Sequence, residues 1–185
     1  MESQDEACCT AFEGARRIAT GRRAEVALKV REVFDRGERA PVLIFDDVTG
    51  EQIELDVRGT AEEVIGRYSA PARGPGRPRL GVIAREVTLL PRHWELLNGQ
   101  PGGASVALRK LVEEARRTHE VRDRVRRSRE AAYRFMAALA GNFPDFEEAT
   151  RALFAGDRGR FDALIEPWPV DVREHARMLA VDAFP

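Results

Sequence analysis

A single predicted strand in the middle of the chain constrains the fold most. Residues 82–90 predict a largely apolar strand that ends before Pro91, and two helical segments follow, a short one to about Leu97 and a longer one that opens at Ser105. One strand beside two short helices cannot form a stable sheet alone, because no neighbouring strand completes its hydrogen-bonded ladder. The pattern therefore predicts that a second copy of the chain supplies the partner strand.

Local signals agree on where these two helices begin and end. Proline suits the first helical position, so Pro91 marks the start of the short helix. Gly99 suits a helix end, and Ser105, after the turn Pro101-Gly-Gly-Ala104, suits an N-cap. The sequence thus predicts two helices joined by a glycine-containing turn.

The longer helix has an apolar stripe that fades along its length. There is no Gly or Pro from Ser105 to Ala140, yet ten of the fifteen residues from Arg116 to Glu130 are charged. This stretch predicts either a break or a solvated helix, with burial resuming at Ala132, Phe135, Met136 and Leu139.

The order of strand, short helix, turn and longer helix resembles the ribbon-helix-helix family of DNA-binding proteins. The resemblance covers about residues 82–117 and rests on Arg85-Glu-Val-Thr-Leu-Leu-Pro-Arg-His-Trp94 and Gln100-Pro-Gly-Gly-Ala-Ser105. In that family the strand pairs antiparallel with the same strand of a second subunit, and the two-stranded ribbon lies in the major groove. The resemblance implies a homodimer, with duplex DNA as its partner.

The resemblance also implies that outward side chains of the strand read the bases, and two registers stay open. If Val87 and Leu89 face the core, Thr88 and Glu86 face the groove. If Leu90 is the last core position, Arg85, Val87 and Leu89 face it instead. We favour the first register because it buries more apolar side chains, with Arg85 as a basic neighbour of the groove. An outward Glu86 either accepts a hydrogen bond from a cytosine amino group or indicates that DNA is not the ligand.

The start of the longer helix matches the place where the family anchors a phosphate. The resemblance assigns this contact to Gly103, Ala104 and Ser105, because backbone N–H groups and the helix dipole favour an anion at a helix N-terminus. Arg109 and Lys110 are assigned to further phosphate contacts. The alternatives are an ordinary corner that needs glycines for its bend, and a solvated helix face with acidic partners at helical spacing.

A basic tract precedes the strand. Gly76-Arg-Pro-Arg79 resembles the core of an AT-hook, in which arginines reach the floor of a narrow minor groove, although the usual preceding Pro-Arg is replaced by Gly74-Pro75. The resemblance implies that Arg77 and Arg79 form an arm that contacts DNA beside the ribbon. A merely flexible linker is the alternative.

The first 68 residues predict a small strand-helix-hairpin unit. An irregular strand at Thr10–Thr20 precedes a helix at Arg23–Phe34, and Pro41–Phe45 with Gln52–Val57 predict a hairpin. Asp46 and Asp47 would suit acid–base chemistry, but directly before Val48-Thr-Gly50 they are typical of a turn. Thr60 and Glu63 form the capping-box pattern of a further short helix.

The expected fold class is therefore α+β. The domains expected are the unit of residues 1–68, a Gly- and Pro-rich basic linker at 69–80, a ribbon-helix-helix module at 81–118, and a helical region at 119–185. The last region contains several short helical segments, with Trp168 and the Phe residues as its predicted core.

Charge is distributed unevenly along the chain. Residues 1–66 carry 9 basic and 15 acidic side chains, residues 67–129 carry 15 and 6, and residues 130–185 carry 6 and 10. Almost all of the positive charge is arginine, whose planar fork suits phosphate and guanine. The middle segment is therefore the expected nucleic-acid surface.

Other classes of function have no positive signal in the sequence. No apolar run is long enough to cross a membrane, and we expect a cytoplasmic protein without membrane contact. His93, His119 and His175 lie far apart, and Cys8 and Cys9 are adjacent, so no spaced metal motif is present. There is no phosphate loop, dinucleotide fingerprint or nucleophile elbow. We expect neither an enzyme nor a bound cofactor.

The whole chain also resembles an uncharacterised bacterial family that is known only as a domain of unknown function, number 2239. The stretches already quoted carry this resemblance, together with Phe143-Pro-Asp-Phe146 and the residues that follow it to Gly156. It implies no activity. Two hypotheses follow: a dimeric DNA-binding regulator, or a homodimeric interaction module that presents its acidic N- or C-terminal region to a protein partner.

Overall fold

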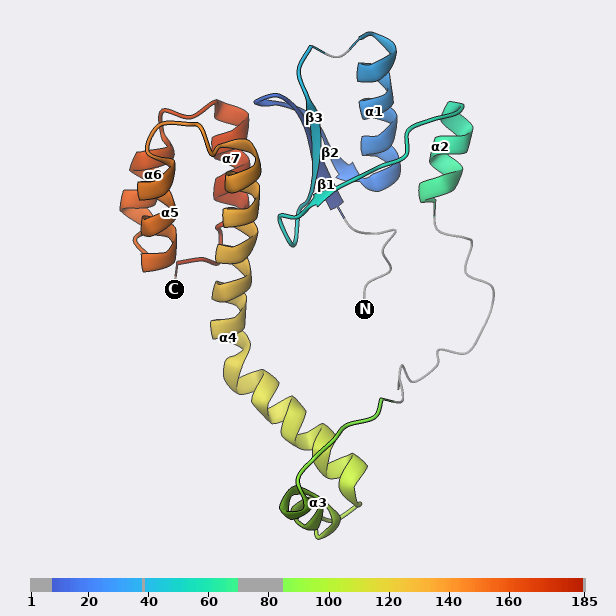
Figure 1. The fold of residues 1–185 in the computed structure, drawn as a ribbon, viewed down its shortest axis with the longest axis vertical. Coiled ribbons are helices and arrows are strands. Elements are labelled where there is room, and N and C mark those ends of the chain that lie inside the picture. Colours follow the sequence, from blue (N-terminus) through green and yellow to red (C-terminus); the bar gives the residue numbers. More distant parts are fainter. Residues whose placement is uncertain (1–7, 38, 70–84, 185) are drawn as a thin grey trace. The chain divides into compact units, whose positions relative to one another are not determined.

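The computed structural model describes residues 8–37, 39–69 and 85–184. The chain divides into two compact units, which Figure 1 draws as a ribbon. Unit 1 comprises residues 1–71 and 124–185, and unit 2 comprises residues 72–123. The described residues form one four-stranded antiparallel sheet and seven helices, so the predicted α+β class is confirmed.

The sheet of unit 1 has the strand order β2-β1-β3-β4. Its strands are β1 (Cys8–Glu13), β2 (Arg16–Arg22), β3 (Val42–Asp46) and β4 (Gln52–Ile53). The prediction of one irregular strand at Thr10–Thr20 is wrong. Gly14, with φ of +59°, turns the chain back between β1 and β2, and the two strands pair antiparallel. The predicted hairpin of β3 and β4 is confirmed.

One face of the sheet is covered by α1 (Arg23–Asp35). This helix buries Val26 and Val30 against Cys9, Ala11 and Ile44 of the sheet. The predicted helix is confirmed, although Phe34, at its end, is 46% exposed rather than buried. Apolar spacing in the sequence therefore located the helix and most of its buried face.

The opposite face of the sheet packs on the C-terminal part of the chain (Figure 1). Phe12 and Phe45 lie against Phe135, with ring centroids 5.5 and 5.0 Å away. Trp168 is buried in the same core, as predicted, and its indole N–H donates to the Pro144 carbonyl at 2.8 Å. The helices that complete this core are α5 (Phe146–Ala155), α6 (Arg158–Ile165), α7 (Val170–Leu179) and the end of α4 (Ala104–Leu139).

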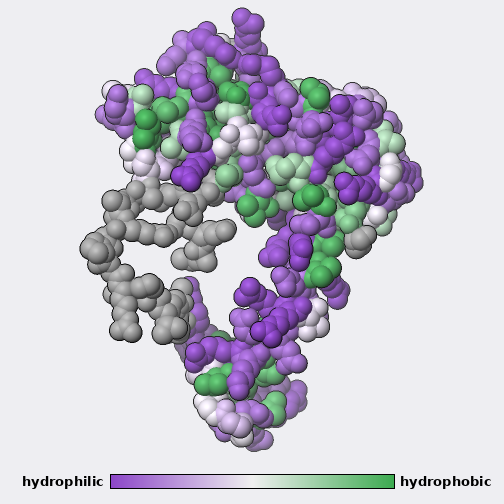
Figure 2. All heavy atoms as spheres, turned by 180° about the vertical axis from the view of Figure 1, so that it is seen from behind, coloured by the Kyte–Doolittle hydropathy of each residue, from purple (hydrophilic) through white to green (hydrophobic). Residues whose placement is uncertain are grey.

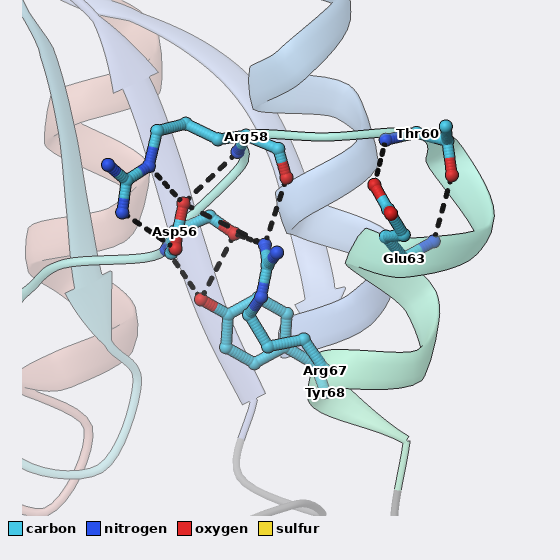
Figure 3. Close-up of polar contacts among 6 residues, drawn as sticks. All are labelled: Asp56, Arg58, Thr60, Glu63, Arg67 and Tyr68. Atoms are coloured by element: carbon cyan, nitrogen blue, oxygen red, sulfur yellow. Dashed lines mark hydrogen bonds and ion pairs between the residues drawn. The ribbon is translucent and has the colours of Figure 1, made fainter.

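A second short helix, α2 (Ala61–Tyr68), follows the last strand. Its predicted capping box is present: the Thr60 hydroxyl accepts from the Glu63 N–H at 3.2 Å, and the Glu63 carboxylate accepts from the Thr60 N–H at 2.7 Å (Figure 3). These two bonds satisfy backbone donors that a helix start leaves unpaired.

Side chains at the end of α2 form hydrogen bonds with backbone groups of the residues that follow β4. The Tyr68 hydroxyl accepts from the Asp56 N–H, and the Arg67 guanidinium donates to the Asp56 and Arg58 carbonyls (Figure 3). Arg58 also donates to the Asp56 carboxylate, and this bond lowers the pKa of Asp56. Side chains therefore take the place of a further strand at this edge, which leaves fewer backbone groups open for pairing with another chain.

Unit 2 contains α3 (Pro91–Asn98) and the first part of α4. Pro91 occupies the first turn and Gly99 the C-cap, as predicted. The prediction of Ser105 as N-cap is wrong, because α4 already begins at Ala104. The Gly103 carbonyl accepts the N–H groups of Val106 and Ala107, so the helical pattern starts one residue earlier than the serine suggested.

The long helix α4 is unbroken, which confirms the solvated-helix alternative. Every residue from Arg109 to Arg122 is exposed, and burial resumes at Ala131. The buried positions that follow are Ala132, Phe135 and Met136, while Leu139 is partly buried.

A substitution in the turn between β3 and β4 tests how closely this turn packs against α4. Gly50 has φ of +65°, and a Cβ atom there would lie 2.0 Å from the Ala131 carbonyl oxygen of α4. We expect Gly50→Ala to lower the free energy of unfolding by more than about 2 kcal/mol, through backbone strain and displacement of the turn. Urea unfolding followed by circular dichroism measures it.

Gly66→Ala is the matched control. Gly66 lies within α2, no atom lies within 4 Å of an added Cβ, and its φ is helical. Alanine there should leave stability unchanged or raise it by about 0.5–1 kcal/mol. Equal behaviour of the two variants would contradict the contact between the turn and α4.

Candidate nucleic-acid interface

The segment that precedes α3 holds the predicted base-reading residues. Arg85–Leu90 has no regular secondary structure in the single chain, and residues 82–84 of the predicted strand lie outside the described residues. Arg85, Glu86 and Thr88 are all exposed, whereas Leu89 is half-buried. The structure therefore places these side chains together on the surface of unit 2, and the ribbon with a second copy stays a prediction.

The corner between α3 and α4 holds the predicted phosphate anchor. Gly102 and Gly103 have φ of +89° and +75°, a backbone conformation that glycine adopts readily. The Gly103 N–H already donates to the Gln100 carbonyl at 3.0 Å. Of the three residues assigned to this contact, Ala104 and Ser105 are therefore the ones at the start of α4 whose N–H groups could meet an anion.

Arg109 and Lys110 are exposed on the next turn of α4. The Arg109 guanidinium donates to the Ser105 carbonyl at 3.0 Å, which holds the side chain beside the start of the helix. A shallow hollow of about 480 Å³ is lined by both residues and by Glu113, Glu114 and Arg117. Basic and acidic side chains thus share this part of the helix. The predicted minor-groove residues Arg77 and Arg79 lie outside the described residues.

Unit 2 buries little of its own apolar surface. Among its described residues, only Leu97 and Ala107 are buried hydrophobics. His93, predicted at the edge of a small core, is exposed. Apolar side chains emerge among the hydrophilic ones on the surface of unit 2 (Figure 2). The large apolar residues that are more than a third exposed in this unit are Val87, Leu90, Trp94, Leu96, Leu111, Val112 and Val121.

A mainly apolar hollow is lined by α3, the turn that follows it and the start of α4. It has a volume of about 210 Å³ and is lined mainly by Leu96, Leu97, Ala107 and Leu111. Interiors of folded proteins are close-packed, so an open hollow beside α3 and the start of α4 leaves room for side chains of a partner. The exposed residues among them, Leu96 and Leu111, are candidates for burial by a partner.

Unit 1 contains a buried polar pair that the sequence analysis did not find. The His175 imidazole of α7 is 2% exposed, and its Nε2 atom lies 3.7 Å from Asp47 Oδ1. Neither atom has a hydrogen-bond partner. The two residues are 128 positions apart in the sequence and share no motif, so only the packing of α7 on the sheet brings them together.

The two neighbouring aspartates have different surroundings. Asp46 accepts the N–H groups of Val48 and Thr49, so the predicted turn role is confirmed for it. Asp47 points into the core, where burial raises its pKa while a hydrogen bond from Thr10 opposes the shift. Burial lowers the pKa of His175 to about 4. Burial likewise raises the pKa of the Cys9 thiol to about 12, which makes it a poor nucleophile.

The described residues hold no group of three or more His, Cys, Asp or Glu side chains that could bind a metal ion. None of their helices is long and apolar enough to span a bilayer.

The chain belongs to a family described as an uncharacterized protein conserved in bacteria (DUF2239), which matches residues 8–180. The expected membership of this family is thereby confirmed. No curated protein and no solved structure matches the chain.

The buried histidine makes stability depend on pH. The unfolded chain protonates His175 near pH 6.5 and the folded chain only near pH 4, so the unfolded state binds more protons between these values. We expect the stability that His175 contributes to be present above pH 6.5 and to be lost as the pH falls to 4, on the order of 1–3 kcal/mol. Urea unfolding at several pH values measures it.

His175→Gln removes this titration and is the comparison that isolates it, because Asp47 also titrates in acid. The difference in stability between wild type and variant should shrink as the pH falls from 6.5 to 4. A difference that stays constant with pH would contradict a buried, neutral imidazole.

Proposed function

We propose that the protein is a homodimer that binds duplex DNA and acts as a transcriptional regulator. In this proposal the segments around Arg85–Leu90 of two copies pair as a ribbon that enters the major groove. The observation that carries the proposal is that unit 2 has almost no core of its own. Its described part exposes seven large apolar side chains and buries two hydrophobic residues. A second copy would cover this surface and supply the absent strand.

The charge of unit 2 supports DNA as the partner. Residues 72–123 contain ten Arg or Lys and six Asp or Glu, a net charge of +4, which leaves −5 for unit 1. Affinity for duplex DNA comes largely from neutralised phosphates. In the proposal Thr88 and Glu86 face the bases with Arg85 beside them, and the start of α4 with Arg109 and Lys110 contacts phosphates. Arg77 and Arg79 form the minor-groove arm.

A second candidate function is protein interaction, in which the same module serves only to form the dimer. Glu113 and Glu114 lie beside Arg109 and Lys110 and lower the positive potential there, which favours this alternative. A dimer that binds no duplex, but retains a protein partner after nuclease treatment of a cell extract, would support it.

Proline substitutions test the ribbon. Successive N–H groups of a strand point to opposite edges, so one of Val87→Pro and Thr88→Pro removes a ladder hydrogen bond in either register. In the single chain both residues are exposed and lie outside regular structure, so proline costs little there. We expect at least one variant to shift sedimentation from dimer to monomer at micromolar concentration.

Thr88→Ala is the control for these two variants, because it keeps the N–H group and should leave the dimer intact. Dimers of unchanged affinity in both proline variants would contradict the shared ribbon.

The salt dependence of binding tests the DNA contacts. Affinity for a random-sequence duplex, measured by fluorescence anisotropy, should fall with salt by a log–log slope of about −0.9 for each phosphate neutralised. Arg109→Gln and Lys110→Gln should each reduce that slope by about 0.9. Lys29→Gln, on the exposed face of α1, is the charge-matched control. Absence of duplex binding at low salt, or equal slopes for all four proteins, would refute the proposal.

A further inference from the structure

We propose that unit 1 carries a binding site for a phosphate dianion, either free phosphate or the phosphate monoester of a small molecule. The site lies at the end of the β1–β2 hairpin, where the side chains of Arg16 and Arg36 and the backbone of Arg39 contact one buried glutamate. It is formed by residues of unit 1 alone and does not depend on the DNA contacts of unit 2.

The buried glutamate organises the arginines. The Glu13 side chain is 5% exposed and sits at the last position of β1. Its Oε1 atom accepts the Arg39 N–H at 2.9 Å, and its Oε2 atom accepts from the Arg36 guanidinium at 3.0 Å and from that of Arg16. These bonds, led by that of the Arg39 N–H, lower the pKa of Glu13 and keep it ionised. The carboxylate thereby fixes two guanidinium groups beside each other.

The described residues of this cluster carry an excess of positive charge. The guanidinium groups of Arg16 and Arg36 contact the one carboxylate, and Arg39 lines the same hollow. In the described part of the chain these three arginines form no ion pair with any other acidic side chain. The side chains of Arg16 and Arg36 are 58% and 52% exposed, so they reach solvent as well as the glutamate. Each guanidinium has five N–H donors, and Glu13 occupies only part of them.

The surface at this cluster is concave. A hollow of about 520 Å³ is lined by Glu13, the three arginines and Ala40. The Gly14 N–H donates to the Pro41 carbonyl at 2.9 Å, which ties the hairpin turn to the chain before β3. A Cβ on Gly14 would lie 3.1 Å from that of Ala40, so the turn and residues 40–41 are in close contact. The backbone that carries the arginines is therefore held in place by these contacts.

The chemistry of this hollow favours a compact anion with two negative charges. Guanidinium groups bind phosphate through paired, charge-assisted hydrogen bonds. A dianion offsets the excess charge of two left by the three arginines and Glu13. A phosphodiester, with a single charge, offsets half of it, so DNA backbone is the poorer ligand.

Calorimetric titration of the full-length protein with inorganic phosphate, at constant ionic strength, tests the site. We expect saturable binding of one phosphate per chain, weakened at least about tenfold by Arg36→Gln and by Arg39→Gln. Arg151→Gln, an exposed arginine of α5, removes the same charge elsewhere and should leave the affinity unchanged. Absence of saturable binding, or equal weakening by Arg151→Gln, would overturn the proposal.

Two further measurements distinguish a small-molecule phosphate from the DNA backbone, and a third variant replaces either of the first two if it is destabilised. Adenosine 5′-monophosphate, as a monoester, should bind as tightly as phosphate or more tightly, while Arg36→Gln should leave the affinity for duplex DNA unchanged. Weakening of duplex binding by Arg36→Gln would instead assign the hollow to the DNA backbone and refute the small-ligand site. Arg16→Gln repeats the test if either other variant unfolds at a lower temperature than wild type.

Discussion

The contact of Phe12 and Phe45 with Phe135 holds unit 1 together. It joins the second face of an N-terminal sheet to a helix about ninety residues further along the chain. Burial of large aromatic rings is among the most favourable single contributions to folding. Because this contact anchors the end of α4, the C-terminal helices share one core with the sheet. The buried pair of Asp47 and His175 arises from the same packing.

The described residues of unit 2 form no comparable contact between buried aromatic rings. The helix α4 is anchored by its last turns in unit 1, and its first turns lie beside the short helix α3. Among the described residues of unit 2, the buried hydrophobics are Leu97 and Ala107, and a hollow stays open beside them. Small domains with so little buried apolar surface are rarely stable alone, and on this ground we propose that a twofold copy completes the core. The proposed DNA-binding function depends on that step.

Local patterns predicted the elements well where side chains and turns act within a few residues. The helical spacing of Val26 and Val30, the proline at the start of α3 and the capping box at Thr60 all gave correct elements. The β1–β2 hairpin was missed because Gly14 is the only strong turn residue in an otherwise strand-like stretch. Ser105 was a plausible cap, but the two glycines before it let the helix begin earlier.

Contacts between segments far apart in the chain could not be predicted from the sequence. Nothing near Asp47 indicates His175, and nothing near Glu13 indicates that Arg36 and Arg39 will return to it after α1. Such clusters depend on how helices pack on the sheet, and the spacing of apolar residues within one element does not predict that packing. The sequence predicted the exposed segment of Arg85, Glu86 and Thr88 from the order of neighbouring elements, and its role as a ribbon stays a prediction.

Hydrogen exchange of the backbone amides of residues 85–90 tests the shared ribbon most directly. If two copies pair through this segment, alternate amides are protected, and their protection rises with protein concentration. If every amide from Arg85 to Leu90 exchanges at the rate of an unstructured peptide at all concentrations, no ribbon exists and the DNA-binding dimer is excluded.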